Sequence, residues 1–113
     1  MAAISDFEHQ RILEIIAAVA GNDWNRFKFL SDDPFLNEES MFEQFEDSRL
    51  KVADGFGDWQ KSLGVKKTKD GSRMIHLHVQ PKIPGDSEIV LTLHSLKNRI
   101  SIWAFYQIPD FSD

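Results

Sequence analysis

The chain has 113 residues, of which 42% are hydrophobic, 13 are Lys or Arg and 18 are Asp or Glu. This length and composition fit one α+β domain over residues 1–113 with a core of its own. The sequence contains no cysteine, which excludes disulfides, thiolate catalysis, thiolate zinc sites and iron–sulfur clusters. The missing cysteines also suit a reducing compartment, so we expect a cytoplasmic protein.

The first helical segment is expected to be amphipathic rather than a signal peptide. It lacks an early basic region, and Asp6, Glu8 and Glu14 interrupt its apolar pattern. Its longest uninterrupted apolar run, residues 15–20, is much shorter than the ~20 residues that cross a membrane. We therefore expect no membrane partner.

Charge is distributed unevenly along the chain. Residues 1–60 carry 13 acids and 5 bases, a net charge of −8, whereas residues 61–113 carry 5 acids and 8 bases, a net charge of +3. The acids concentrate in residues 32–58, where nine of them face only Arg49 and Lys51. Phosphate contacts need clustered Lys and Arg, so this bias argues against direct binding to nucleic acid.

The N-terminal half is predicted to begin with a helix over residues 5–20. Apolar side chains there approximate one helical face, and Ser5 with Glu8 matches a capping box. Gly21 and Asn22 supply the left-handed stop that ends such a helix. Residues 22–36 contain four aromatic side chains around an Asp-Asp-Pro break, which predicts a short helical turn followed by a loop.

A second long helix is predicted over residues 38–53. Asn37 is its expected N-cap, and the acids that follow favour a helix N-terminus. Met41, Phe42 and Phe45 form its apolar stripe, and the glycines after it predict a bent connection to the next element.

The C-terminal half is predicted to be an antiparallel sheet. Asp70 and Gly71 favour a tight primed turn between a strand at residues 65–68 and a strand that begins near Arg73. In this second strand and in the next one, apolar and polar residues alternate, and pairing Ile75 with Leu93 aligns their apolar faces. The connections are short, so consecutive strands should pair as a meander.

The last strand, residues 99–108, is apolar on both faces. Regular alternation puts four residues on one face and two on the other, namely Ile100, Ile102, Ala104 and Tyr106 against Trp103 and Phe105. A strand with two apolar faces is usually covered on both sides. We therefore predict two N-terminal helices packed on a meander of three to four strands, and we favour a second helix that covers the face carrying Trp103. The alternative is that part of this face stays open as an aromatic and histidine-lined groove for a ligand or a partner.

Three histidines are the one candidate set of metal ligands. His76, His78 and His94 should share the sheet face opposite the core, where imidazole nitrogens could converge on zinc, copper or iron. No Asp or Glu stands beside them in the strands to orient them. An outward sheet face also carries polar side chains without any ligand, so we predict neither a metal nor another cofactor.

The acidic segment is the preferred candidate for function. We predict that it binds a basic protein partner, because complementary charge accelerates and orients association. The partner-binding residues would be seven acids, Asp32, Asp33, Glu38, Glu39, Glu43, Glu46 and Asp47. Trp24 or Phe35 would serve as an apolar anchor, since interfaces combine an aromatic centre with a polar rim. The alternative is a solvated helix face that keeps the protein soluble.

These features predict a non-catalytic protein-binding module. No catalytic set is recognisable, and small size with concentrated acid fits an inhibitor or immunity-type protein that neutralises a basic enzyme, for instance by occupying a nuclease-like cleft. The alternative function is a small metal- or ligand-binding domain, conceivably an enzyme, that uses His76, His78 and His94.

Overall fold

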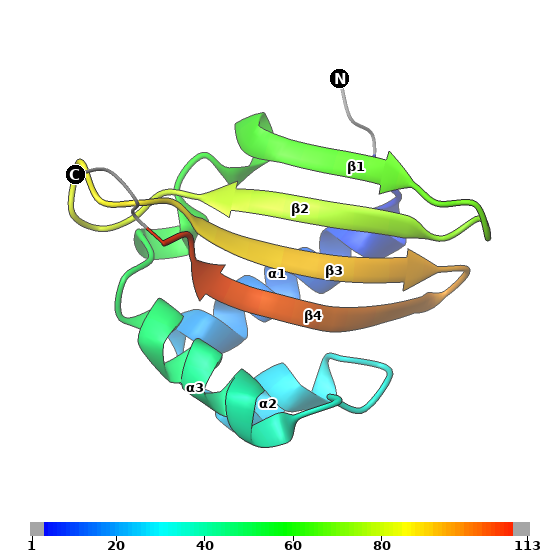
Figure 1. Cartoon of the computed structure of the whole chain (residues 1–113), viewed down its shortest axis with the longest axis horizontal. Helices are drawn as coiled ribbons and strands as arrows, with labels where there is room; N and C mark the ends of the chain where they lie inside the picture. The colour runs from blue at the N-terminus through cyan, green and yellow to red at the C-terminus, as the bar shows by residue number, and fades with distance from the viewer. Residues whose placement is uncertain (1–3, 110–113) are drawn as a thin grey trace.

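The computed structural model describes residues 4–109. Three helices come first, α1 (Asp6–Ala20), α2 (Trp24–Phe29) and α3 (Glu38–Arg49), followed by two short 3-10 helices, η1 (Asp54–Phe56) and η2 (Trp59–Ser62). Four strands follow, β1 (Leu63–Lys67), β2 (Arg73–Val79), β3 (Ile89–Leu96) and β4 (Arg99–Gln107). They pair in sequence order as an antiparallel sheet. Figure 1 shows α1 behind the sheet and α3 beside β4, which confirms the predicted α+β fold.

Helix α1 begins with the predicted capping box. The Ser5 side chain accepts a hydrogen bond from the Glu8 backbone N–H, and the Glu8 carboxylate accepts one from the Ser5 backbone N–H. The inner face of the helix is buried in the core through Ile12, Ile15, Ala18 and Val19. None of the helices in residues 4–109 is long and apolar enough to cross a membrane.

The end of α1 differs from the prediction in one residue. Gly21 has φ −88° and Asn22 has φ 51°, so Asn22 alone takes the left-handed conformation. The Gly21 N–H still donates to Ala17 O (3.0 Å), which keeps Gly21 in the last turn and moves the reversal to Asn22. Asparagine is one of the few residues that enter this conformation at low cost.

Helix α3 begins at the predicted cap, Asn37, and ends earlier than predicted. The helix stops at Arg49 rather than continuing through residues 38–53. The reason is competition for backbone hydrogen bonds. Val52 N–H still donates to Ser48 O (3.1 Å) in the preceding turn, but Ala53 N–H donates to Gln80 O (2.8 Å) and Lys51 O accepts from Lys82 N–H (2.7 Å), so the chain here pairs with the connection after β2.

The register of the sheet is the predicted one between β2 and β3. Ile75 lies opposite Leu93, and Met74 lies opposite His94. Both Ile75 and Leu93 are fully buried beneath α1. The hydrophobic alternation therefore sets the register, because a shift by one residue would turn the apolar side chains away from the core.

The turn between β1 and β2 contains Asp70 and Gly71 as predicted, but its backbone conformation is not that of the predicted primed turn. Only Gly71 has positive φ (88°), whereas a primed turn of type I′ needs two such residues. Gly71 N–H donates to Thr68 O (3.2 Å), and Thr68 N–H donates to Ser72 O (2.9 Å). This pattern is a three-residue loop with a left-handed glycine, and Asp70 contributes by accepting hydrogen bonds from Ser72 N–H and Oγ.

A β-bulge in β4 overturns the predicted faces of the residues that follow it in that strand. Thr92 pairs with Ala104 and Leu93 pairs with Ile102, so Trp103 is an extra residue without a partner. One extra residue reverses the alternation. Phe105 consequently joins Ile102 in the buried core, and Trp103, which is 55% exposed, lies on the other side.

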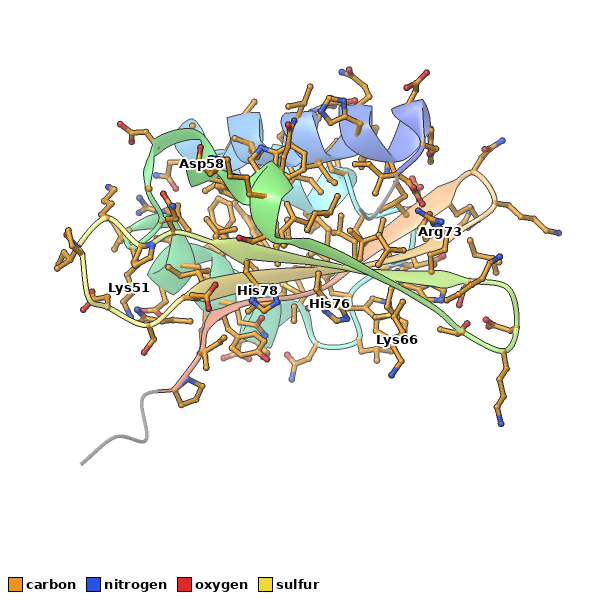
Figure 2. All side chains as sticks on the ribbon, turned by 90° about the horizontal axis from the view of Figure 1, so that it is seen from above. Lys51, Asp58, Lys66, Arg73, His76 and His78 are labelled. Carbon is orange, nitrogen blue, oxygen red and sulfur yellow. The ribbon has the colours of Figure 1, made fainter. Side chains whose placement is uncertain are left out.

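The sheet face opposite α1 is open. Its side chains, which we call the open face, include Lys66, Met74, His76, His78, Val90, Thr92, His94, Ser101, Trp103, Ala104 and Tyr106. Figure 2 shows Lys66, His76 and His78 projecting away from α1. The prediction that the second helix covers this face is wrong, because α3 runs beside β4 and bonds to its edge.

Candidate functional site

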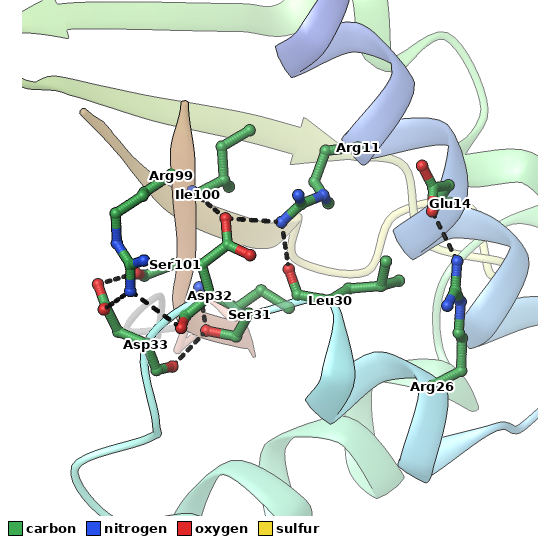
Figure 3. A network of polar contacts seen from close by, with 11 residues as sticks. Arg11, Glu14, Arg26, Leu30, Ser31, Asp32, Asp33, Arg99, Ile100 and Ser101 are labelled. Atoms are coloured by element: carbon green, nitrogen blue, oxygen red, sulfur yellow. Dashed lines mark hydrogen bonds and ion pairs between the residues drawn. The ribbon is translucent and has the colours of Figure 1, made fainter. Parts of the chain in front are cut away.

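The loop after α2 closes the outer edge of β4. The Asp32 backbone N–H donates to Ile100 O (2.8 Å), and Asp32 Oδ2 accepts from Ile100 N–H (2.7 Å). Ser31 Oγ accepts from Ile102 N–H (2.9 Å). Figure 3 shows the carboxylate of Asp32 bonded to Ile100, with Ser31 beside it. An edge strand otherwise exposes such groups to solvent or to other chains, so the loop protects this edge.

Two arginines hold the same loop in place. Arg11 Nη1, from α1, lies 3.1 Å from Asp32 Oδ2. Arg99 pairs with Asp33, whose other oxygen accepts a hydrogen bond from Ser101 Oγ (2.6 Å). The hydrogen bond from Ser101 and then the one from Arg99 lower the pKa of Asp33. Asp32 and Asp33, predicted to bind a partner, thus have intramolecular contacts that fasten the loop to β4.

Helix α3 closes the remainder of this edge. Gln44 Oε1 accepts from Phe105 N–H (2.8 Å), and Ser48 Oγ donates to Phe105 O (2.9 Å). Ser48 is fully buried. These two polar residues stand on the inward stripe of α3, beside the buried Met41 and Phe45, and they fix the helix alongside β4.

The outward side of α3 is acidic. The α3 acidic surface consists of Glu38, Glu39, Glu43, Glu46 and Asp47, five of the seven predicted acids. Three of them have nearby cations: Glu38 with Lys28 (3.4 Å), Glu46 with Arg49 (2.8 Å) and Asp47 with Lys51 (2.9 Å). Within residues 4–109, Glu39 and Glu43 form no ion pair, and both are exposed. Their negative charge is therefore uncompensated.

The two predicted anchors belong to an aromatic cluster. The rings of Trp24 and Phe35 lie 5.9 Å apart, and Trp24 also contacts Phe42 edge-on at 5.1 Å. Trp24 and Phe35 are half-buried. Phe42 is 40% exposed at the margin of the cluster, and Leu50, which caps the C-terminus of α3, is 60% exposed. These two present apolar surface beside the acids.

An apolar groove lies next to the α3 acidic surface. Its volume is about 450 Å³, and it separates the N-terminal half of α3 from β4 and from the loop before α3. The buried Met41 and Ile102 contribute to its lining, together with the exposed Leu36 and Trp103. This α3–β4 groove is large enough to receive an apolar side chain of a partner.

The three histidines each have a different neighbour. His78 Nδ1 lies 3.6 Å from Glu88 Oε2, His76 Nδ1 lies 3.4 Å from Thr92 Oγ1, and the His94 ring stacks on Trp103 at 4.7 Å. In the described part of the chain, no group of three or more His, Asp or Glu side chains is placed to hold a metal ion. The alternative metal site therefore gains no support from this arrangement.

No protein family, curated protein or solved structure matches the chain. The functional inference consequently rests on the residues and their geometry.

The sequence did not identify four of these residues. Trp103 and Leu36 line the groove, and Gln44 and Ser48 form hydrogen bonds with the edge of β4. A signal for the last two was present, since both are polar positions on the predicted inward stripe of a helix. Trp103 lies on the sheet face predicted for it, but its place in the groove depends on α3 running beside β4, which the sequence did not predict.

Proposed function

We propose that the chain is a non-catalytic protein-binding module that binds and neutralises a basic enzyme through the α3 acidic surface and the α3–β4 groove. The observation that supports this most is the juxtaposition of uncompensated carboxylates, Glu39 and Glu43, with an apolar groove on the neighbouring side of the same helix. Stable interfaces combine these two elements, an apolar centre and a polar rim.

The two elements would act at different stages of association. The negative field of α3 attracts and orients a cationic partner before contact. An apolar side chain of the partner then enters the groove between Met41 and Trp103 and slows dissociation. The existing ion pair of Asp47 is solvent-exposed, and that of Glu46 lies at the surface with both side chains half-buried. Such pairs are worth about 0–1 kcal/mol, so exchanging them for cations of the partner costs little.

The linear arrangement of the negative charges on α3 favours a cleft of the partner as the binding site. Glu39, Glu43 and Glu46 follow one stripe of α3, and the helical rise separates the first two by about 6 Å along the axis. A linear array of negative charge is complementary to a cationic cleft that holds a phosphate backbone. A nuclease-like enzyme is therefore the class of partner that this surface fits best.

The test compares two double variants with the same change in charge. Glu39→Gln with Glu43→Gln removes the uncompensated charges of α3, whereas Asp86→Asn with Glu88→Gln removes two charges near the β2–β3 connection. Each tagged chain is used to capture proteins from an extract of the source cells. Each captured enzyme is then assayed with and without the purified chain.

The proposal expects a stoichiometric basic enzyme that is captured and inhibited by the native chain and by the Asp86/Glu88 variant. The Glu39/Glu43 variant should lose both effects. Equal capture and inhibition by the two variants would show that α3 is not the binding surface, and capture without inhibition would refute neutralisation of the enzyme.

A further inference from the structure

The outer edge of β1 is left open, in contrast to the closed edge of β4. Thr68 N–H donates to Ser72 O (2.9 Å) across the hairpin. Bonded pairs alternate along an antiparallel ladder, so Gly64 and Lys66 direct their backbone groups toward β2. The backbone groups of Leu63, Val65 and Lys67 therefore point outward.

These outward groups have no partner in the described structure. Within residues 4–109, no hydrogen bond reaches the N–H or C=O groups of Leu63, Val65 or Lys67 from outside the sheet. The opposite edge differs, because Asp32, Gln44 and Ser48 occupy the corresponding groups of β4. One edge is thus closed by side chains, and the other presents a row of free donors and acceptors.

The open edge is also cationic. Lys66, Lys67 and Lys69 are exposed and form no ion pair with any described residue. Lys66 lies on the open face (Figure 2), and Lys67 lies on the α1 side, opposite Arg73. The acid in the adjoining turn, Asp70, is already engaged by Thr68 and Ser72. Positive charge therefore flanks the free backbone groups on both faces of the sheet.

We propose that β1 is a docking edge for an extended acidic segment of a partner protein, which would join the sheet as a fifth strand. Backbone hydrogen bonds to Leu63, Val65 and Lys67 would supply affinity, as in other cases of strand addition. Lys66 and Lys67 point to opposite faces, so the segment needs two consecutive acids, one for each lysine. This surface is separate from α3 and has the opposite charge, so it does not depend on the proposed function.

A second copy of the chain fits this edge poorly. Pairing two β1 strands would bring Lys66 and Lys67 of one copy close to the same lysines of the other. Like charges on neighbouring strands are destabilising, and lysine on an edge strand discourages pairing between copies. An acidic segment turns the same lysines into attractive contacts.

The first test uses a labelled short peptide of valine and threonine with two adjacent glutamates at its centre. Lys67→Pro removes an outward donor and leaves the bonds to β2 intact, whereas Lys69→Pro places proline in the turn, where it is tolerated. Both variants lose one charge. We expect Lys67→Pro to raise the peptide Kd at least about tenfold more than Lys69→Pro does.

The second test needs no variant. Amide hydrogen exchange of the native chain should show new protection at Leu63, Val65 and Lys67 when the peptide binds, with no change at Gly64 and Lys66, whose N–H groups already face β2. The same peptide with glutamines in place of glutamates should bind more weakly.

Three results with the peptide would overturn the proposal. They are absence of peptide binding, equal Kd values for Lys67→Pro and Lys69→Pro, and binding without the alternating protection. Self-association of the free chain through β1 would overturn it as well, because the occupant would then be a second copy.

Discussion

The carboxylate of Glu8, in the first turn of α1, lies 3.1 Å from Nε of Arg73 in β2. It also accepts a 2.7 Å hydrogen bond from Ser95 Oγ in β3. Glu8 is only 4% exposed, so this acid ties the start of the helix to two strands beneath it. Burial alone would raise the pKa of Glu8, but the hydrogen bonds from Ser5, Ser95 and Arg73 outweigh burial and lower the pKa.

Replacing Glu8 with Gln should therefore destabilise the fold by about 2–4 kcal/mol at neutral pH, because Arg73 loses its buried counter-charge. Since the folded pKa lies below the unfolded value, this stability is complete above that unfolded value and is lost as pH falls through the folded pKa. The deficit of the variant should shrink in acid. Urea unfolding near neutral pH and near pH 3 measures both effects.

The matched control is Glu14→Gln on the same helix. Glu14 pairs with Arg26 at 2.7 Å on the surface, so its removal should cost less than about 1 kcal/mol. A Glu8→Gln variant that unfolds at the same urea concentration as Glu14→Gln would contradict the role given to Glu8.

The assignment of sheet faces predicts unequal costs for two β-strand substitutions. Leu91 is fully buried, whereas His78 lies on the open face. Leu91→Ala should cost roughly 2–5 kcal/mol through lost burial and a cavity, and His78→Ala should cost less than about 1 kcal/mol. Denaturant unfolding decides this, and similar losses in both variants would mean that the open face is covered.

Closure of the β4 edge predicts an effect on association as well as on stability. Gln44→Ala with Ser48→Ala removes both side-chain partners of the Phe105 backbone and should cost roughly 2–5 kcal/mol in total. The exposed edge should also promote concentration-dependent association. Sedimentation of the variant beside Gln10→Ala, an exposed helical glutamine, tests this, and a monomeric double variant at all concentrations would argue against edge protection.

The conformation of the loop between β1 and β2 predicts that replacing Gly71 with alanine costs more stability than replacing Gly64. Gly71 has φ 88°, so Gly71→Ala should cost about 1–2 kcal/mol from strain alone. Gly64 has an ordinary strand conformation with its nearest contact at 3.9 Å, so Gly64→Ala should change stability by less than about 0.5 kcal/mol. Thermal unfolding compares the two, and equal shifts would contradict the turn geometry.

Local patterns in the sequence predicted the parts of the fold that depend on neighbouring residues. The capping box of Ser5 and Glu8 and the cap at Asn37 are both confirmed, because each involves contacts within one turn. The pairing of Ile75 with Leu93 is also confirmed. Alternation excludes the registers shifted by one residue, because such a shift would turn one apolar set away from the core.

Features that depend on distant contacts were not predictable in this way. The bulge at Trp103 reverses the faces of the β4 residues that follow it, and a run that is apolar throughout contains no signal for where alternation breaks. The acids at Asp32 and Asp33 read as free surface charge in the sequence, yet both bond to β4 and to arginines far along the chain. Only the structure shows that Asp32 and Asp33 are held by intramolecular contacts, whereas Glu39 and Glu43 form no ion pair with any described residue.

The most direct measurement of the proposed function is the association rate with the captured basic enzyme as a function of salt. For the native chain, the rate should be high at low salt and fall steeply toward 0.1 M, where the Debye length is about 10 Å. Glu39→Gln with Glu43→Gln should slow association and flatten this salt dependence, whereas Asp86→Asn with Glu88→Gln should leave both nearly unchanged. A native rate that is independent of salt, or one unaffected by the Glu39 and Glu43 substitutions, would contradict binding through α3.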